Sequence, residues 1–104
     1  MPTAAAFDRW LTDHGASAGE VVISLWNKRS RRQTVGLRDL QEVALCHGWV
    51  DSQVKRIDAE RYAIRFVPRS ARSRWSHKNR DMARRMIEAK RMRPEGKASL
   101  PPDL

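Results

Sequence analysis

The stretch from residue 37 to residue 57 constrains the fold most, because its hydrophobic pattern changes abruptly at one glycine. Five side chains recur at the spacing of a single helix face: Leu37, Leu40, Val43, Ala44 and His47. Gly48 follows directly, and glycine readily adopts the left-handed conformation that ends many helices. Residues 49–57 have the composition of extended chain. The sequence therefore predicts a helix over residues 37–47 that leads through Gly48 into a strand.

Two more extended segments complete a predicted sheet. Residues 20–26 are rich in β-branched and aromatic side chains and precede a polar, basic loop at 27–32. Their alternation predicts two sides, both at least partly covered: Val21, Ile23 and Leu25 on one, Val22 and Trp26 on the other. Residues 58–61 have the composition of a turn, and Tyr62, Ile64 and Phe66 then share one face. We expect an antiparallel hairpin of residues 49–57 and 62–66, extended by the strand at 20–26.

Helices are predicted on either side of these strands. Thr3 can cap a helix that ends at Gly15 and has one partly apolar face: Phe7, Trp10, Leu11 and His14. After Pro68 ends the hairpin, Ser76 can cap a helix that runs to about Lys90. Its predicted inner arc contains Asn79, Met82, Ala83, Met86, Ile87 and Ala89. Arg80, Arg84 and Arg91 line up on the opposite side at 100° per residue.

These segments predict an α+β fold in which a small antiparallel sheet of about three strands is packed by three or so helices. Residues 1–93 are expected to form a single domain whose core includes Leu45, Trp49 and Ile64. Residues 94–104 are rich in Pro, Gly and charge without periodicity, which predicts a loosely ordered tail. With 104 residues and 40% apolar side chains, the chain can build a small core but not a large internal ligand cavity.

The charge of the chain is concentrated in one half. Residues 54–93 hold 14 basic and 4 acidic side chains, whereas the other residues hold 7 and 8, and the formal net charge is +9. Such a field attracts polyanions, so the stripe of Arg80, Arg84 and Arg91 is a candidate for contact with nucleic acid. The alternative is that these arginines are simply solvated.

The cysteine content and the lengths of the apolar runs indicate the cellular compartment of the protein. The single cysteine excludes an internal disulfide, and the N-terminal residues lack the apolar run of a signal peptide. No apolar run is long enough to cross a bilayer. We expect a cytoplasmic protein without membrane insertion.

The sequence predicts no catalytic residue, metal site or cofactor. Cys46 and His47 are neighbours on a helix and point about 100° apart, so Cys46 is better interpreted as a small buried side chain. Ser52, Asp51 and His47 are the residue types of a hydrolase triad, but the turn that usually presents such a serine is missing. The three histidines are far apart, and no metal-binding spacing or Gly-rich phosphate loop occurs.

The sequence better supports a binding site, formed by Asp51 and the loop after Pro68. Asp51 follows Gly-Trp-Val at the start of a strand, and a carboxylate there needs a partner, for which Arg65, Arg69 and Arg74 are the candidates. The loop at 68–76 mixes arginines, hydroxyls and Trp75, which suits a phosphate or carboxylate ligand. The alternatives are that Asp51 forms a structural ion pair and that Trp75 is a core anchor beside solvated arginines.

Four stretches, read in this order, resemble the YdeI/OmpD-associated (OmdA, bacteriocin-protection) family. The first is Glu42-Val-Ala-Leu-Cys-His-Gly-Trp-Val-Asp51, and the second is Arg65-Phe-Val-Pro-Arg69. The third is Ser73-Arg-Trp-Ser-His-Lys-Asn79, and the last is Met92-Arg-Pro-Glu-Gly96. The resemblance covers about residues 5–96. Family members commonly have arginine where this chain has Ser70, and glycine where it has Lys90. They usually continue past a Pro-x-Asp-Leu segment, so the chain resembles a shortened member that holds the N-terminal module.

The resemblance implies a role in bacterial tolerance of bacteriocins or cationic antimicrobial peptides, with no reaction and no catalytic residue assigned. Our leading hypothesis is a non-enzymatic stress or antimicrobial-tolerance protein that binds a protein or a small anionic ligand. The candidate residues are Asp51, Arg65, Arg69, Arg74, Trp75 and Asn79. The alternatives are sequence-indifferent nucleic-acid binding by a small basic protein, and a small-molecule enzyme that uses Asp51 or Cys46.

Overall fold

The computed structural model describes residues 3–27, 36–70 and 74–104. Most of the predicted basic loop, and residues 71–73 of the arginine loop, therefore lie outside the described residues. The elements are α1 (Ala4–His14), β1 (Val21–Trp26), α2 (Leu37–Cys46), β2 (Trp49–Arg56), β3 (Arg61–Pro68), α3 (His77–Glu88) and α4 (Pro94–Ala98). None of the helices in the described ranges is long and apolar enough to cross a membrane.

The strands form a three-stranded antiparallel sheet in the order β1-β3-β2. Ile23 lies opposite Ile64, and Asp51 lies opposite Phe66, with a bulge between Asp51 and Gln53. The predicted α+β class is confirmed, as are the hairpin and its extension by β1.

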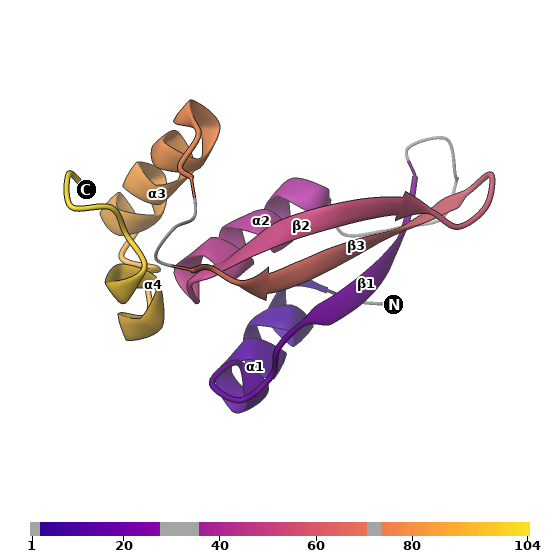
Figure 1. Cartoon of the computed structure of the whole chain (residues 1–104), viewed down its shortest axis with the longest axis horizontal. Helices are drawn as coiled ribbons and strands as arrows, with labels where there is room; N and C mark the ends of the chain where they lie inside the picture. The colour runs from indigo at the N-terminus through magenta and orange to yellow at the C-terminus, as the bar shows by residue number, and fades with distance from the viewer. Residues whose placement is uncertain (1–2, 28–35, 71–73) are drawn as a thin grey trace.

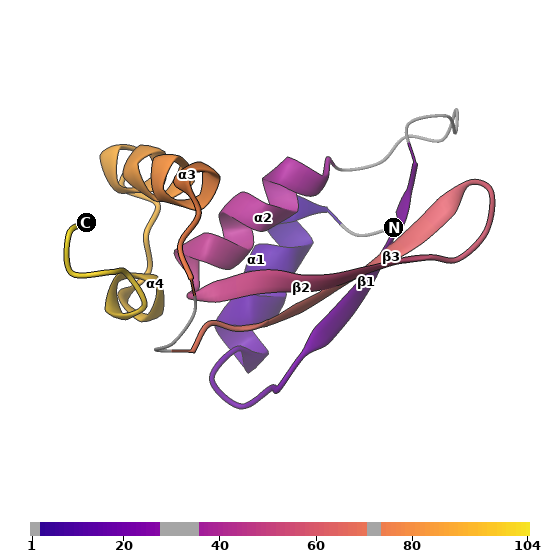
Figure 2. The ribbon, with the colours of Figure 1, turned by 45° about the horizontal axis from the view of Figure 1, so that its top comes forward.

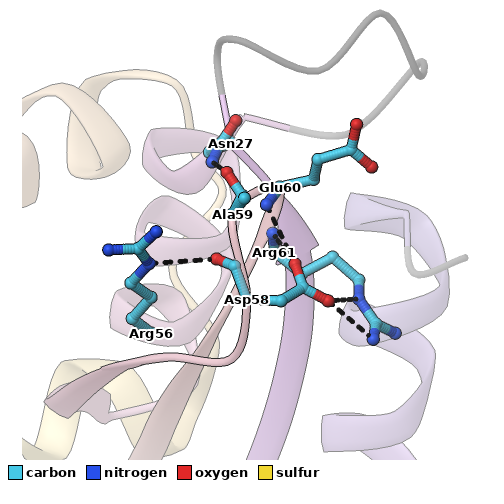
Figure 3. A network of polar contacts seen from close by, with 6 residues as sticks. All are labelled: Asn27, Arg56, Asp58, Ala59, Glu60 and Arg61. Atoms are coloured by element: carbon cyan, nitrogen blue, oxygen red, sulfur yellow. Dashed lines mark hydrogen bonds and ion pairs between the residues drawn. The ribbon is translucent and has the colours of Figure 1, made fainter.

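The hairpin turn is held by one carboxylate. Asp58 Oδ1 accepts hydrogen bonds from the backbone N–H groups of Glu60 and Arg61, and its Oδ2 accepts two from the Arg61 guanidinium (Figure 3). Asn27 Nδ2 donates to the Ala59 carbonyl at 2.7 Å, which joins the end of β1 to the turn. Aspartate side chains often form local hydrogen bonds of this kind, which is why the composition of residues 58–61 predicted a turn.

Helices α1 and α2 pack on one face of the sheet, while α3 and α4 lie beyond one end of it (Figures 1 and 2). The inner face supplies Ile23, Leu25, Ile64 and Phe66 to the main core, together with Trp49. The prediction that both sides of β1 are covered is wrong at Val22, whose side chain is 59% exposed. The reason is that α1 and α2 occupy the same face.

A second core cluster joins α2 to α3. It contains Leu45, Cys46, Met82, Ala83, Met86 and Met92, with Trp75, Leu100 and Leu104 packed against it. Helix α2 thus buries side chains toward both the sheet and α3, and the predicted burial of Leu45, Trp49 and Ile64 is confirmed.

The last predicted helix is shorter than expected. It ends at Glu88, and Lys90 has a φ of 58°, so the chain leaves the helix axis before Arg91. Ile87 is 40% exposed and Ala89 is exposed, which corrects their predicted place on the inner arc. Arg91 consequently does not continue the stripe of Arg80 and Arg84.

Residues 94–104 contain structure that the sequence did not predict. Helix α4 has Pro94 in its first turn and packs so closely on α2 that a Cβ on Gly96 would lie 2.1 Å from the Cys46 carbonyl oxygen. The Arg93 N–H donates to the same carbonyl at 2.9 Å. A helix of five residues is too short to show a hydrophobic period, and it depends on these tertiary contacts.

Candidate functional site

The site is built where β3 ends beside the α2–β2 joint. The backbone N–H of Arg69 donates to the Gly48 carbonyl at 2.8 Å, which places the chain after β3 next to that joint. Gly48 has a φ of 80°, and a Cβ there would lie 2.9 Å from the Glu95 carbonyl oxygen. Glycine is required here both for the left-handed conformation and for the close approach of α4.

The Arg69 guanidinium is held in place but is not fully paired. It stacks on the Trp75 ring, with Cζ 3.9 Å from the ring centroid, and Nη1 donates to the Arg74 carbonyl at 3.3 Å. Nε is buried and has no hydrogen-bond acceptor among the described residues. Burial lowers the pKa of this guanidinium from its ordinary value, and the negative charge of Asp51 partly opposes that shift.

Arg69 lines an open pocket of about 350 Å³. The end of α1 and the residues after it contribute Leu11, Thr12, Gly15 and Ala16, and the joint contributes His47, Gly48 and Trp49. The remaining walls come from Pro68 and from α4 and the residue after it, through Glu95, Ala98 and Ser99. The pocket therefore presents polar and apolar surface in about equal amounts.

The two sequence interpretations of the loop are combined in the structure. Trp75 packs against the second core cluster, so it is a core anchor, and it also carries the stacked Arg69. The backbone N–H of Asn79 donates to Ser76 Oγ at the cap of α3, a contact that does not use the Asn79 side chain. The Arg74 side chain is exposed, and its carbonyl is what contacts Arg69.

The predicted ion pair of Asp51 does not form within the described residues. Its Oδ1 instead accepts a long hydrogen bond from Gln41 Nε2 at 3.4 Å. Arg65 is engaged elsewhere, with Glu20 before β1. Antiparallel pairing explains this, since Arg65 lies opposite Val22 and Gln53, on the sheet side away from Phe66 and Asp51.

Each of the three nucleic-acid candidates has a carboxylate partner. Arg80 pairs with Asp103, Arg84 with Asp81 at 3.0 Å, and Arg91 with Glu42 at 3.6 Å. These pairs reduce the positive charge that the predicted stripe presents to a polyanion.

Sequence reasoning missed a polar contact between the buried His47 at the α2–β2 joint and Asp8 on α1. His47 is 5% exposed, and its Nε2 lies 2.7 Å from Asp8 Oδ1, while Arg93 Nη2 lies 3.5 Å from Asp8 Oδ2. The hydrogen bond with His47 is the main cause that lowers the pKa of Asp8. Asp8 lies 39 residues before His47 and 85 before Arg93, and no local pattern links residues so far apart.

Asp8, Cys46, Arg91 and Arg93 line a second pocket of about 300 Å³. Burial raises the pKa of the Cys46 thiol, which disfavours the thiolate that nucleophilic chemistry needs. The Ser52–Asp51–His47 combination is not assembled as a triad, because the His47 ring is bonded to Asp8 and Ser52 is exposed. No group of three or more His, Cys, Asp or Glu side chains within the described ranges is arranged to hold a metal ion.

The fold and the site define a small α+β domain with an open pocket, containing an arginine, at the junction of its sheet and helices. The chain belongs to the family described as "Domain of unknown function (DUF8412)", which matches residues 1–99. No curated protein and no solved structure matches the chain significantly. The family match does not test the resemblance to the YdeI/OmpD-associated family, which stays a prediction.

Proposed function

We propose that this protein acts by binding, and that Arg69 anchors an anionic group of a small ligand in the pocket beside Gly48. The observation that carries the proposal is a half-buried arginine whose buried Nε–H has no acceptor among the described residues, at the wall of an open pocket. Leaving a buried charged donor unmatched costs free energy, on the order of 1–3 kcal/mol or more, and an anionic ligand group near this guanidinium would offset that cost.

The same contacts make Arg69 a pre-organised anchor. Trp75 covers one face of the guanidinium, and the Arg74 carbonyl fixes Nη1. A side chain that is already ordered loses little rotamer entropy when it binds, so more of the interaction energy appears as affinity. Asp51 stabilises the charged form of Arg69 without forming an ion pair that a ligand would have to displace.

We further propose that the binding serves stress or antimicrobial tolerance in the bacterial cytoplasm, as the YdeI/OmpD-associated resemblance implies. The four stretches that carry that resemblance meet at this pocket. His47 to Trp49, Pro68, Arg69 and Glu95 line it, and Trp75 supports Arg69. A net charge of +9 disfavours direct capture of cationic peptides, so the proposed partner is a protein or a small anion instead.

The binding proposal is tested by titrating the full chain with 4-methylpentanoate and with inorganic phosphate. The indole N–H signals in a heteronuclear NMR spectrum report on Trp75 and Trp49, which flank the site. We expect at least one of the two anions to shift these signals, and Arg69→Gln to weaken its binding about tenfold or more, because a charge-assisted hydrogen bond is lost.

Arg74→Gln is the matched control, since it removes an exposed guanidinium and leaves the backbone carbonyl that contacts Arg69. Equal affinities for wild type and Arg69→Gln, with both proteins folded, would rule out Arg69 as the anchor. The cellular role is tested by deleting the gene in its native host and restoring either version. Full tolerance of a cationic antimicrobial peptide with Arg69→Gln would separate that role from this pocket.

A further inference from the structure

The same pocket contains a negative group whose partner the described structure does not supply. Glu95, in the first turn of α4, lines the pocket together with Arg69. No ion pair in the described part of the chain includes Glu95, although a cationic side chain shares its pocket. Glu95 is exposed, so its carboxylate is accessible to a ligand in the pocket that it shares with Arg69.

Gly48 contacts the backbone of both residues. Its carbonyl accepts the hydrogen bond from the Arg69 N–H, and its α-carbon packs against the Glu95 carbonyl. The α2–β2 joint is therefore wedged between the chain that carries Arg69 and the helix that carries Glu95. Helix α4 also packs closely on the Cys46 carbonyl through Gly96, which fixes the position of Glu95 relative to the joint.

Apolar residues also line the pocket, among them Leu11, Trp49, Pro68 and Ala98. We propose that the ligand is a zwitterionic α-amino acid with an apolar side chain. Its carboxylate binds the Arg69 guanidinium, its ammonium group binds the Glu95 carboxylate, and its side chain contacts the apolar walls. This inference rests on the proposed anion site at Arg69 and adds a requirement for a cationic group. A pocket of about 350 Å³ is at the small end of ligand sites, which fits a ligand of this size.

The test compares three ligands of one carbon skeleton by isothermal titration calorimetry with the full chain at neutral pH. L-Leucine carries both charges, 4-methylpentanoate lacks the ammonium group, and isopentylamine lacks the carboxylate. We expect leucine to bind about tenfold or more tightly than either analogue, because each analogue leaves one charged protein group unpaired.

Substitutions then assign each charge. Glu95→Gln is expected to lower the affinity for leucine to that for 4-methylpentanoate, and to leave 4-methylpentanoate binding unchanged. Arg69→Gln is expected to lower the affinity for both carboxylate ligands, leucine and 4-methylpentanoate. Glu88→Gln, an exposed carboxylate on α3 away from the pocket, is the matched control and should change neither affinity. Glu95→Ala, with its unfolding midpoint measured beside wild type, repeats the test with a second variant.

The outcomes separate this inference from the proposed function. Equal binding of leucine and 4-methylpentanoate that depends on Arg69 but not on Glu95 would overturn the amino-acid ligand and leave the anion site intact. Leucine binding that is indifferent to Arg69→Gln, or no binding of any of these carboxylates, would overturn the amino-acid inference, and the phosphate titration would then decide the anion site on its own.

Discussion

At the scale of single residues, Lys90 is held in a conformation that suits glycine. Its φ is 58°, and the bonds around it, Arg91 N–H to the Met86 carbonyl and Lys90 N–H to the Ile87 carbonyl, form a Schellman motif at the end of α3. Non-glycine residues are strained in this left-handed backbone conformation. Members of the YdeI/OmpD-associated family, which the sequence resembles, commonly have glycine at this position.

Replacing Lys90 with glycine is therefore expected to stabilise the protein by about 0.5–1 kcal/mol, after the greater entropy of glycine in the unfolded chain is counted. The measurement is the urea unfolding midpoint. Lys90→Ala is the control, since it removes the charge and keeps the strain. If alanine stabilised the protein as much as glycine did, the effect would come from charge and not from the backbone.

Asp8 should make stability depend on pH in the acid range. The pKa of Asp8 is lowered from 3.8 in the folded protein, chiefly by its hydrogen bond with His47, so the folded state binds fewer protons. Its contribution is then fully present above the ordinary carboxyl pKa and is lost as pH falls through the lowered one. Asp8→Asn should reduce the unfolding free energy at pH 7, and its stability should fall less between pH 5 and pH 2.

The control for Asp8 is Asp13→Asn, because Asp13 is an exposed carboxylate on the same helix. Denaturant unfolding at a series of pH values measures both variants. Parallel pH curves for wild type and Asp8→Asn would contradict the assignment, since Asp58 and Asp103 also have lowered pKa values and would then account for the acid loss.

At the scale of elements, the contact between α2 and α4 depends on Gly96. A Cβ at this position would lie 2.1 Å from the Cys46 carbonyl oxygen and 2.6 Å from its carbon, both of which are backbone atoms that cannot move aside. Gly96→Ala should displace α4 and destabilise the fold by about 1–3 kcal/mol. It should also weaken ligand binding, because Glu95 would move. Gly19→Ala is the control, as nothing lies within 4 Å of a Cβ there.

The joint between α2 and β2 depends on Trp49. The ring is buried and meets Trp10 edge-on with centroids 6.0 Å apart, so it connects α1 to the sheet. Trp49→Ala should cost about 3–5 kcal/mol, because the loss of buried surface is followed by an incompletely filled cavity. Thermal unfolding measures the effect, and a melting temperature within a few degrees of wild type would contradict it.

At the scale of the whole molecule, the net charge of +9 does not by itself make a nucleic-acid surface. Because Arg80, Arg84 and Arg91 already have carboxylate partners, we expect binding to duplex DNA to be weak and lost near physiological salt. Titration of fluorescent duplex and single-stranded DNA at two salt concentrations measures this. A complex that survives about 0.15 M salt and is weakened by Arg84→Gln would favour the nucleic-acid alternative.

Much of the fold could be predicted, and the exceptions have physical causes. Helix α2 and the hairpin were predicted to within about two residues, because their periods extend over several turns or alternations. Helix α4 was missed because five residues carry no period, and the exposure of Val22 was missed because alternation does not say which face is covered. Arg69 and Trp75 were predicted as site residues from composition, whereas Glu95 and the Asp8–His47 pair were not.

The sequence by itself determined the class of the fold, the ends of most elements and the residues of the main core, because hydrophobic period, capping and turn chemistry act between neighbours in the chain. Only the tertiary structure decided which charges meet. It paired Asp8 with His47, took Arg65 away from Asp51 to Glu20, and brought Arg69 and Glu95 to one pocket. Contacts between distant segments depend on how the helices and sheet pack, and no local pattern of residues records that packing.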